Sequence, residues 1–174
     1  MTHTALIIAA ALAVPATAGA QAVNDAQIAS IVVTANQVDI DAGKLAAERA
    51  SRPEVRKFGE LMVTDHTGVN KAAVELVTKL NVTPQDNPTS QSLKAGGDKN
   101  IANLKTLKGT AFDKAYVDQE VAYHTAVLDA VDKVLIPNAS NAELKALLVK
   151  VRPAFVAHLE HARKVQASLG GASE

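Results

Sequence analysis

Three histidines lie within the apolar faces of three predicted helices, and imidazole is the commonest metal ligand in proteins. The three residues are His66, His124 and His158. Each stands where the helical repeat otherwise places an aliphatic side chain. Helices that bury these faces direct three imidazoles toward one core, where the rings could bind a metal ion or exchange a proton.

A carboxylate joins this set when the first two predicted helices are laid antiparallel. If Ala50 pairs with Pro53 across the short turn, His66 lies level with about Gln37. Asp39 is two residues from that level, or ~3 Å along the helix axis. Asp39 also lies at the edge of the buried stripe of its helix. The candidate metal ligands are therefore Asp39, His66, His124 and His158.

The register between the last two predicted helices leaves two arrangements of the histidines open. We pair these helices at Leu135 and Asn141. His124 then lies level with about Arg152 rather than with His158, a mismatch of ~9 Å. A different loop length or a kink could close this gap. The sequence is therefore compatible with one cluster of three histidines or with two separate polar pairs.

Imidazoles and carboxylates without sulfur are suited to a divalent transition metal such as Zn, Fe, Mn, Ni or Cu(II). Nothing in the sequence selects one of these ions. A di-iron carboxylate centre requires Glu-x-x-His on two helices, and Val63, Val121 and Phe155 stand three residues before the candidate histidines. That type of centre is therefore not expected. Glu120 precedes His124 by four residues and could face the same ligand.

The elements that must position these residues are helices. Apolar residues repeat every three or four positions over about 24–50, 53–80, 110–135 and 141–169. Residues 93–108 are expected to form a short, broken helical crossover, because Gly96-Gly97 interrupts the pattern. The fold class predicted is all-α, a ferritin-like antiparallel four-helix bundle with a long crossover between the second and third helices.

The start of the second predicted helix carries the pattern of a capping box. Ser51 and Glu54 stand three residues apart, and Pro53 occupies the first turn, where its missing N–H costs nothing. The connection from the first helix is too short for anything but an antiparallel helical hairpin.

The first 20 residues have the pattern of a signal peptide. An apolar run at 5–14 is followed by small residues ending in Ala18-Gly19-Ala20, which fits a signal-peptidase site. The run is shorter than the ~20 residues that span a bilayer. We expect residues 1–20 to be removed, residues 21–174 to form the helical domain, and the mature protein to be periplasmic or associated with the cell envelope.

The composition of the chain argues against several classes of function. Lys and Arg number 18, as do Asp and Glu, so the chain shows no basic footprint for nucleic acid. No later apolar run is long enough for a membrane helix. The chain has no cysteine, which excludes disulfides and thiolate metal sites. An envelope partner or a homo-oligomer is compatible with these properties.

Short motifs distributed along the chain form a specific set. The first half contains ANQVD at 35–39, KLA at 44–46, VRKF at 55–58 and MVTDHT at 62–67. The second half contains Gly109, FDKAYV at 112–117, His124, Pro153 and His158-Leu159. Together they resemble a bacterial family of exported, ferritin-like helical proteins of unknown function, often labelled as outer-membrane proteins. The resemblance implies a bundle in the cell envelope and no established activity.

Three functions are compatible with these patterns, and the sequence names no reaction. The first is a non-catalytic stress or interaction protein of the envelope, whose histidines form buried polar pairs. The alternative is a metal-binding or redox protein that uses the His/Asp set. The third is a protein that binds a small molecule in the interior of the bundle.

Overall fold

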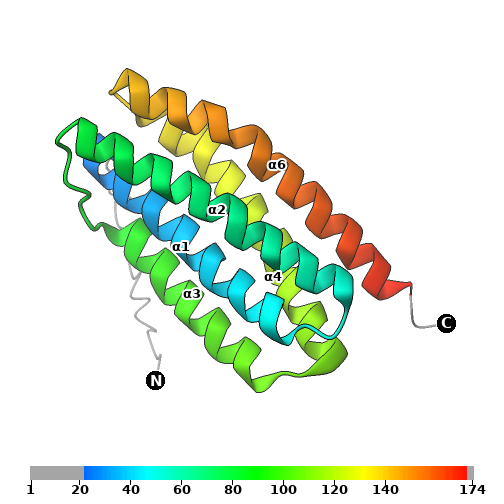
Figure 1. The fold of residues 1–174 in the computed structure, drawn as a ribbon. Helices are drawn as coiled ribbons and strands as arrows, with labels where there is room; N and C mark the ends of the chain where they lie inside the picture. The colour runs from blue at the N-terminus through cyan, green and yellow to red at the C-terminus, as the bar shows by residue number, and fades with distance from the viewer. Residues whose placement is uncertain (1–21, 172–174) are drawn as a thin grey trace, which may run out of the picture.

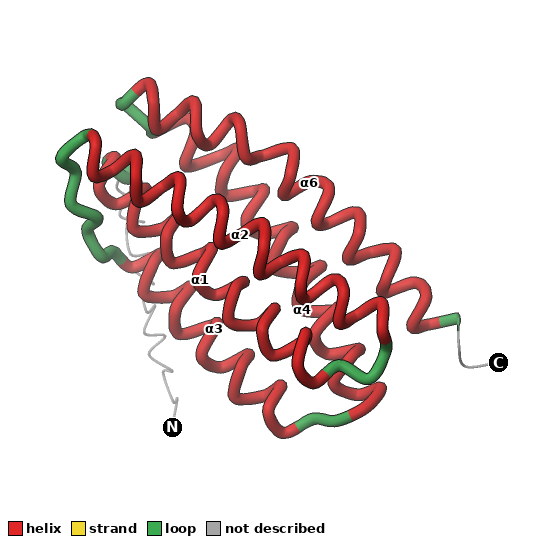
Figure 2. The backbone as a smooth tube through the Cα atoms, viewed as in Figure 1, coloured by secondary structure: helices red, strands yellow, loops and turns green. Residues whose placement is uncertain are grey.

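The computed structural model describes residues 22–171 and consists of helices (Figures 1 and 2). The predicted signal peptide at 1–20 lies outside the described residues. The long helices are α1 (Asp25–Arg49), α2 (Pro53–Lys79), α3 (Pro88–Thr106), α4 (Gly109–Ala130) and α6 (Ala142–Gly170). A π-helical turn, η1 (Val131–Leu135), and the short α5 (Ile136–Asn138) continue α4. No strand occurs within 22–171, so the all-α prediction is confirmed.

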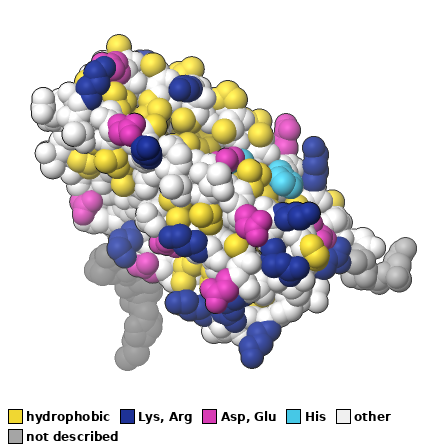
Figure 3. All heavy atoms as spheres, viewed as in Figure 1, with side chains coloured by type: hydrophobic (Ala, Val, Ile, Leu, Met, Phe, Trp, Pro, Cys, Tyr) yellow, Lys and Arg dark blue, Asp and Glu magenta, His cyan; other side chains and the backbone are white. Residues whose placement is uncertain are grey.

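Four of the helices form an antiparallel bundle. α1 and α2 form one hairpin, α4 and α6 form the other, and α2 also packs against α6. α3 runs back along the outside of α1, so that it connects the two hairpins as a fifth long helix (Figure 1). None of the helices in the described part of the chain has both the length and the apolar character needed to cross a membrane. Acidic and basic side chains are interspersed on the face drawn in Figure 3.

The crossover is a continuous helix, and the prediction of a broken one was wrong. The Asn87 side chain caps α3 by accepting hydrogen bonds from the backbone N–H groups of Thr89 and Ser90. Gly97 does not break the helix because it faces α1 at close range. A Cβ atom at Gly97 would lie 2.7 Å from a methyl carbon of Val38, so only glycine allows this approach of α3 to α1.

The hairpin of α1 and α2 is also held by a close approach of two glycines. A Cβ atom on Gly43 would lie 2.8 Å from the carbonyl oxygen of Gly59, and one on Gly59 would lie 2.7 Å from the carbonyl oxygen of Gly43. These backbones are therefore nearly in contact. Because Gly43 follows Asp39 by one helical turn, this contact also determines how close Asp39 lies to α2.

The N-terminus of α2 is capped from another helix rather than by Ser51. The N-cap residue is Arg52, and its side chain makes no capping bond. The buried Asp113 of α4 accepts hydrogen bonds from the backbone N–H groups of Ser51, at 2.8 Å, and Arg52, at 2.9 Å, and from the Ser51 hydroxyl. The predicted capping box was wrong because a carboxylate brought by tertiary packing fills the same role.

Replacement of Asp113 by alanine is expected to destabilise the fold. The change leaves two backbone N–H groups and one hydroxyl without their acceptor, which costs about 2 kcal/mol of unfolding free energy. Urea denaturation of the two proteins measures this loss. Asp98→Ala on α3 is the control, because Asp98 makes an exposed pair with Lys94 that is worth under ~1 kcal/mol. Equal losses for the two variants would contradict the capping role.

The register of α4 against α6 also differs from the prediction. Helical structure continues past Leu135 to Asn138, and α6 begins at Ala142. The turn therefore brings Asn138 opposite Ala142, which moves the predicted pairing by about four residues, or ~6 Å. Arg152 pairs with Asp132, at 2.6 Å between Nε and Oδ1, and so does not lie level with His124.

The apolar core is divided into two clusters along the bundle. One contains large side chains such as Phe58, Met62 and Tyr116. The other contains Ile28, Leu148 and further aliphatic residues nearer the opposite end. On every bundle helix the candidate ligand falls in sequence between the two clusters. The structure therefore has a buried polar layer with apolar packing on both sides.

Candidate metal centre

The four candidate ligands meet in one place. The ring centroids of His66, His124 and His158 are 5.1 to 5.6 Å apart. Asp39 Oδ2 lies 2.9 Å from His66 Nε2 and 3.4 Å from His124 Nε2. None of the four residues is more than 4% exposed. Of the two arrangements left open by the sequence, the structure has the single cluster, which we call the histidine cluster.

A hydrogen bond to α1 fixes the ring of His66. The Asn36 amide nitrogen donates to the carbonyl oxygen of Val32 at 2.8 Å, so Asn36 Oδ1 faces His66 and can only accept. His66 Nδ1 lies 2.8 Å from this oxygen and must carry the hydrogen. The other nitrogen, Nε2, is thereby directed at Asp39.

The remaining two rings are held in the same way. His124 Nδ1 donates to the carbonyl oxygen of Glu120 at 3.1 Å, which leaves Nε2 facing the cluster. His158 Nε2 donates to Asp65 Oδ2 at 2.9 Å, and its Nδ1 is buried without a hydrogen-bond partner among the described residues. Metal-binding histidines usually donate their second N–H to such an outer acceptor, because this fixes the ring and its tautomer.

The electrostatic environment favours the neutral forms of His124 and His158 beside an ionised Asp39. Burial, together with the charges of the two other rings, lowers the pKa of His124 to about 4, and Asp39 offsets this only in part. Burial also lowers the pKa of His158, although Asp65 opposes the shift. Burial by itself raises the pKa of Asp39, but the hydrogen bond and charge of His66 outweigh it, so the pKa lies below its ordinary value.

Glu120 is a second buried carboxyl group beside Asp39. Burial raises the pKa of Glu120 well above its ordinary value, and the negative charge of Asp39 raises it further. Burial and the charge of Asp39 therefore both favour the protonated form of Glu120. Asp39, Glu120 and His124 also form a second group, in which one possible ligand atom from each residue lies within 4.8 Å of the other two.

The pH dependence of stability in the metal-free protein is expected to reveal the raised pKa of Glu120. In the unfolded chain Glu120 ionises near its ordinary pKa of 4.5, whereas in the folded chain burial and Asp39 hold its pKa well above that value. The folded state then binds the additional proton, so the contribution of Glu120 to the unfolding free energy falls by ~1.4 kcal/mol per pH unit above this value, until pH reaches the folded-state pKa.

Glu120→Gln tests this expectation, because an amide cannot ionise. The stability of the variant relative to the natural protein should grow as pH rises above about 5, until pH reaches the folded-state pKa of Glu120. Urea denaturation at several pH values measures both proteins. A difference in stability that does not change with pH would show that Glu120 ionises alike in the two states.

Comparison with known proteins places the chain in a family. Residues 10–165 match the sequence profile described as Domain of unknown function (DUF4142). The chain belongs to this family. The DUF4142 description states no activity, and no protein with a curated description matches the chain.

A solved structure shares the fold of this DUF4142 chain. It is described as CopM in the Cu(II)-bound form and superimposes with a TM-score of 0.65 at 16% sequence identity. The superposition covers 84% of this chain and 98% of that one. At this level of identity, the similarity shows a common fold alone.

The structure brings all four sequence-predicted residues of the DUF4142 chain together, but sequence reasoning missed the groups that orient them. Asn36 lies one helical turn before Asp39 on the same buried stripe, so the apolar periodicity of the sequence could have identified it. Asp65 is adjacent to His66, and its pairing with His158 depends on the packing of α2 against α6. His161 lies outside the cluster, with its ring against Phe58 at a centroid distance of 5.0 Å.

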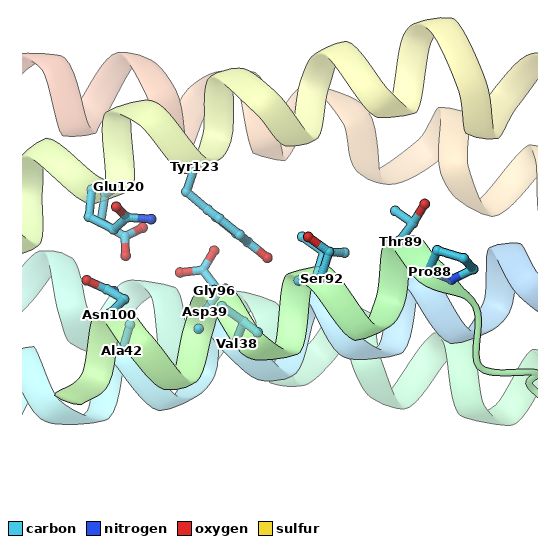
Figure 4. Close-up of a pocket in the computed structure, with 13 residues that line it drawn as sticks. Val38, Asp39, Ala42, Pro88, Thr89, Ser92, Gly96, Asn100, Glu120 and Tyr123 are labelled. Atoms are coloured by element: carbon cyan, nitrogen blue, oxygen red, sulfur yellow. The ribbon is translucent and has the colours of Figure 1, made fainter. Parts of the chain in front are cut away.

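Two hollows reach the histidine cluster. A cleft of about 460 Å³ between α3 and α4 has Asp39, Glu120 and Tyr123 in its lining (Figure 4). A smaller, mainly apolar cavity of about 120 Å³ is lined by His66, His124 and aliphatic side chains. Tyr123 lines both hollows and donates its hydroxyl hydrogen to the carbonyl oxygen of Ala35 at 2.8 Å.

Proposed function

We propose that this protein binds one divalent transition metal ion, Cu(II) by preference, in the histidine cluster. The ligands are Nε2 of His66, Nε2 of His124, Nδ1 of His158 and the carboxylate of Asp39. The observation that carries this proposal is the orientation of the rings. Each imidazole donates one N–H to a group outside the cluster and directs its other nitrogen inward.

The contacts inside the cluster favour a cation over a set of structural polar pairs. With Nδ1–H of His66 committed to Asn36, the other ring nitrogen, Nε2, lies 2.9 Å from Asp39 Oδ2. Two acceptors at this distance need a proton or a metal ion between them. Asp39 Oδ1 and His158 Nδ1 are also buried without hydrogen-bond partners within residues 22–171. Each such group costs about 1–3 kcal/mol, and one metal ion would satisfy the whole set.

The choice of Cu(II) is supported by chemistry and by the fold. Three imidazoles and a carboxylate suit Cu(II) and Zn(II), and among divalent ions of the first transition row Cu(II) binds nitrogen and oxygen ligands most strongly. The fold is shared with a protein described in a Cu(II)-bound form. The coordination itself is argued from the residues of this chain.

A metal-binding role accords with the predicted export of the chain, and we propose the periplasm or envelope as its location. The alternative, a non-catalytic stress or interaction protein, makes a different prediction about the same residues. In that case the polar layer only stabilises the bundle, and the folded protein takes up no metal.

Titration of metal-free protein with Cu(II) tests the proposal. We expect one equivalent to bind, with an electron paramagnetic resonance spectrum that shows coupling to three imidazole nitrogens. The protein should be purified without a histidine tag. His161→Ala is the matched control, because His161 lies outside the cluster, and this variant should bind the metal like the natural protein. A folded protein that binds neither Cu(II) nor Zn(II) would exclude the proposed function.

A further inference from the structure

The cleft between α3 and α4 connects the histidine cluster to the protein surface. Its floor contains Asp39 from α1 and Glu120 from α4, which point toward each other in Figure 4. Its wall on the α3 side includes Gly96 and Asn100. We call this hollow the α3 cleft. It has a volume of about 460 Å³, which is ample for a hydrated metal ion.

The carboxyl groups at the floor of the α3 cleft have few partners. Asp39 and Glu120 contact each other, and Asp39 Oδ1 and Glu120 Oε2 are buried with no hydrogen bond to another residue of the described chain. The two side chains are 1% and 2% exposed. A buried carboxylate oxygen that lines a cleft without a partner is a ready ligand for a cation.

We propose that the α3 cleft is the route by which a hydrated divalent metal ion reaches the histidine cluster, with the Asp39–Glu120 pair as its first protein ligands. This inference rests on the proposed function. Asp39 and Glu120, which releases its proton to the solvent as the ion arrives, replace water ligands of the ion, and His124 Nε2 lies 3.4 Å beyond Asp39 Oδ2. The ion then exchanges oxygen for nitrogen ligands over one short step.

The bundle axis and the smaller cavity offer apolar surroundings to an ion. Along the bundle axis, the two hydrophobic clusters close both sides of the polar layer. The smaller cavity beside His124 is lined mainly by aliphatic residues, and a hydrated cation is strongly disfavoured there. The lining of the α3 cleft also contains apolar residues, but it includes polar side chains that can hydrogen-bond to the water shell of an ion, namely Ser92, Asn100 and Gln119.

Gly96 keeps the opening of the α3 cleft wide. A Cβ atom at this position would have no atom within 4 Å. Gly96 is exposed, whereas its neighbour Gly97 is buried against Val38. A larger side chain at position 96 can therefore occupy the cleft without disturbing the packing of α3 on α1.

Gly96→Leu tests the route, with Gly68→Leu as a matched control. Gly68 is an exposed glycine in the interior of α2 that also has open space around a Cβ atom, but it lies outside the α3 cleft. Stopped-flow mixing of metal-free protein with Cu(II) gives the uptake rate constant, and equilibrium competition gives Kd. We expect Gly96→Leu to slow uptake by about tenfold or more with Kd unchanged, and Gly68→Leu to match the natural protein.

Glu120→Gln tests the first ligands, with the exposed Glu60→Gln as its control. We expect slower uptake in Glu120→Gln alone, while the bound Cu(II) keeps its coupling to three nitrogens. Uptake by Gly96→Leu as fast as in the natural protein would overturn the route and leave the histidine site standing. A natural protein that binds no metal would instead overturn the proposed function, and the route with it.

Discussion

Replacement of His124 by alanine should lower the affinity for Cu(II) by at least about 100-fold, the largest effect on binding of any single change in this chain. His124 is next to every other member of the cluster. Its ring lies 5.6 Å from that of His66 and 5.4 Å from that of His158, and its Nε2 faces Asp39. Its loss removes one nitrogen ligand and opens the site to the adjacent apolar cavity.

Competition with a chelator of known affinity measures this change. Circular dichroism and urea denaturation should accompany it, because a buried side chain is being truncated. His161→Ala serves again as the control, since it removes an imidazole from the same bundle without touching the cluster. Retention of natural affinity in a folded His124→Ala protein would show that the metal binds elsewhere.

Replacement of Gly59 by alanine should lower the unfolding free energy by about 3 kcal/mol. The new Cβ atom would lie 2.7 Å from the carbonyl oxygen of Gly43 and 2.9 Å from the Cβ atom of Ala46. Since one of these is a backbone atom, the clash is relieved only when α1 and α2 move apart. That movement separates Asp39 from His66, so metal affinity should fall as well.

Gly68→Ala is the control for this prediction. Gly68 lies on the same helix with open space around a Cβ atom, so alanine there should stabilise the protein by about 0.5–1 kcal/mol through its higher helix propensity. Thermal and urea denaturation compare the two variants. If Gly59→Ala were as stable as Gly68→Ala, the close packing of the two helices would not determine the stability of the hairpin.

The helical periodicity of the sequence predicted the four bundle helices, and the short turn between the first two predicted the contact of Asp39 with His66. The apolar repeats located the four bundle helices to within a few residues at each end. The pairing of Asp39 with His66 was also correct, because the connection between α1 and α2 is too short to allow a large error in register. Their observed separation of 2.9 Å follows from that constraint.

The incorrect predictions share a physical cause. The role of each of these residues depends on tertiary contacts, which local sequence patterns do not show. Gly97 has the pattern of a helix breaker in the sequence, yet it is required by contact with Val38. Helical structure continues past Leu135, and this extension changed the register enough to hide the meeting of His124 with His158. Asp113 caps a helix that begins far earlier in the chain, which no local pattern indicates.

The ligands of the histidine cluster are widely separated along the chain. Asp39, His66, His124 and His158 come from four different helices, one each from α1, α2, α4 and α6. No two of them form a local chelating motif, so the unfolded chain is expected to bind a metal ion weakly. An ion bound in the cluster would therefore act as a four-way cross-link in a protein that has no cysteine. Folding stability and metal supply would thereby be coupled, and the protein would resist unfolding most when the ion is abundant.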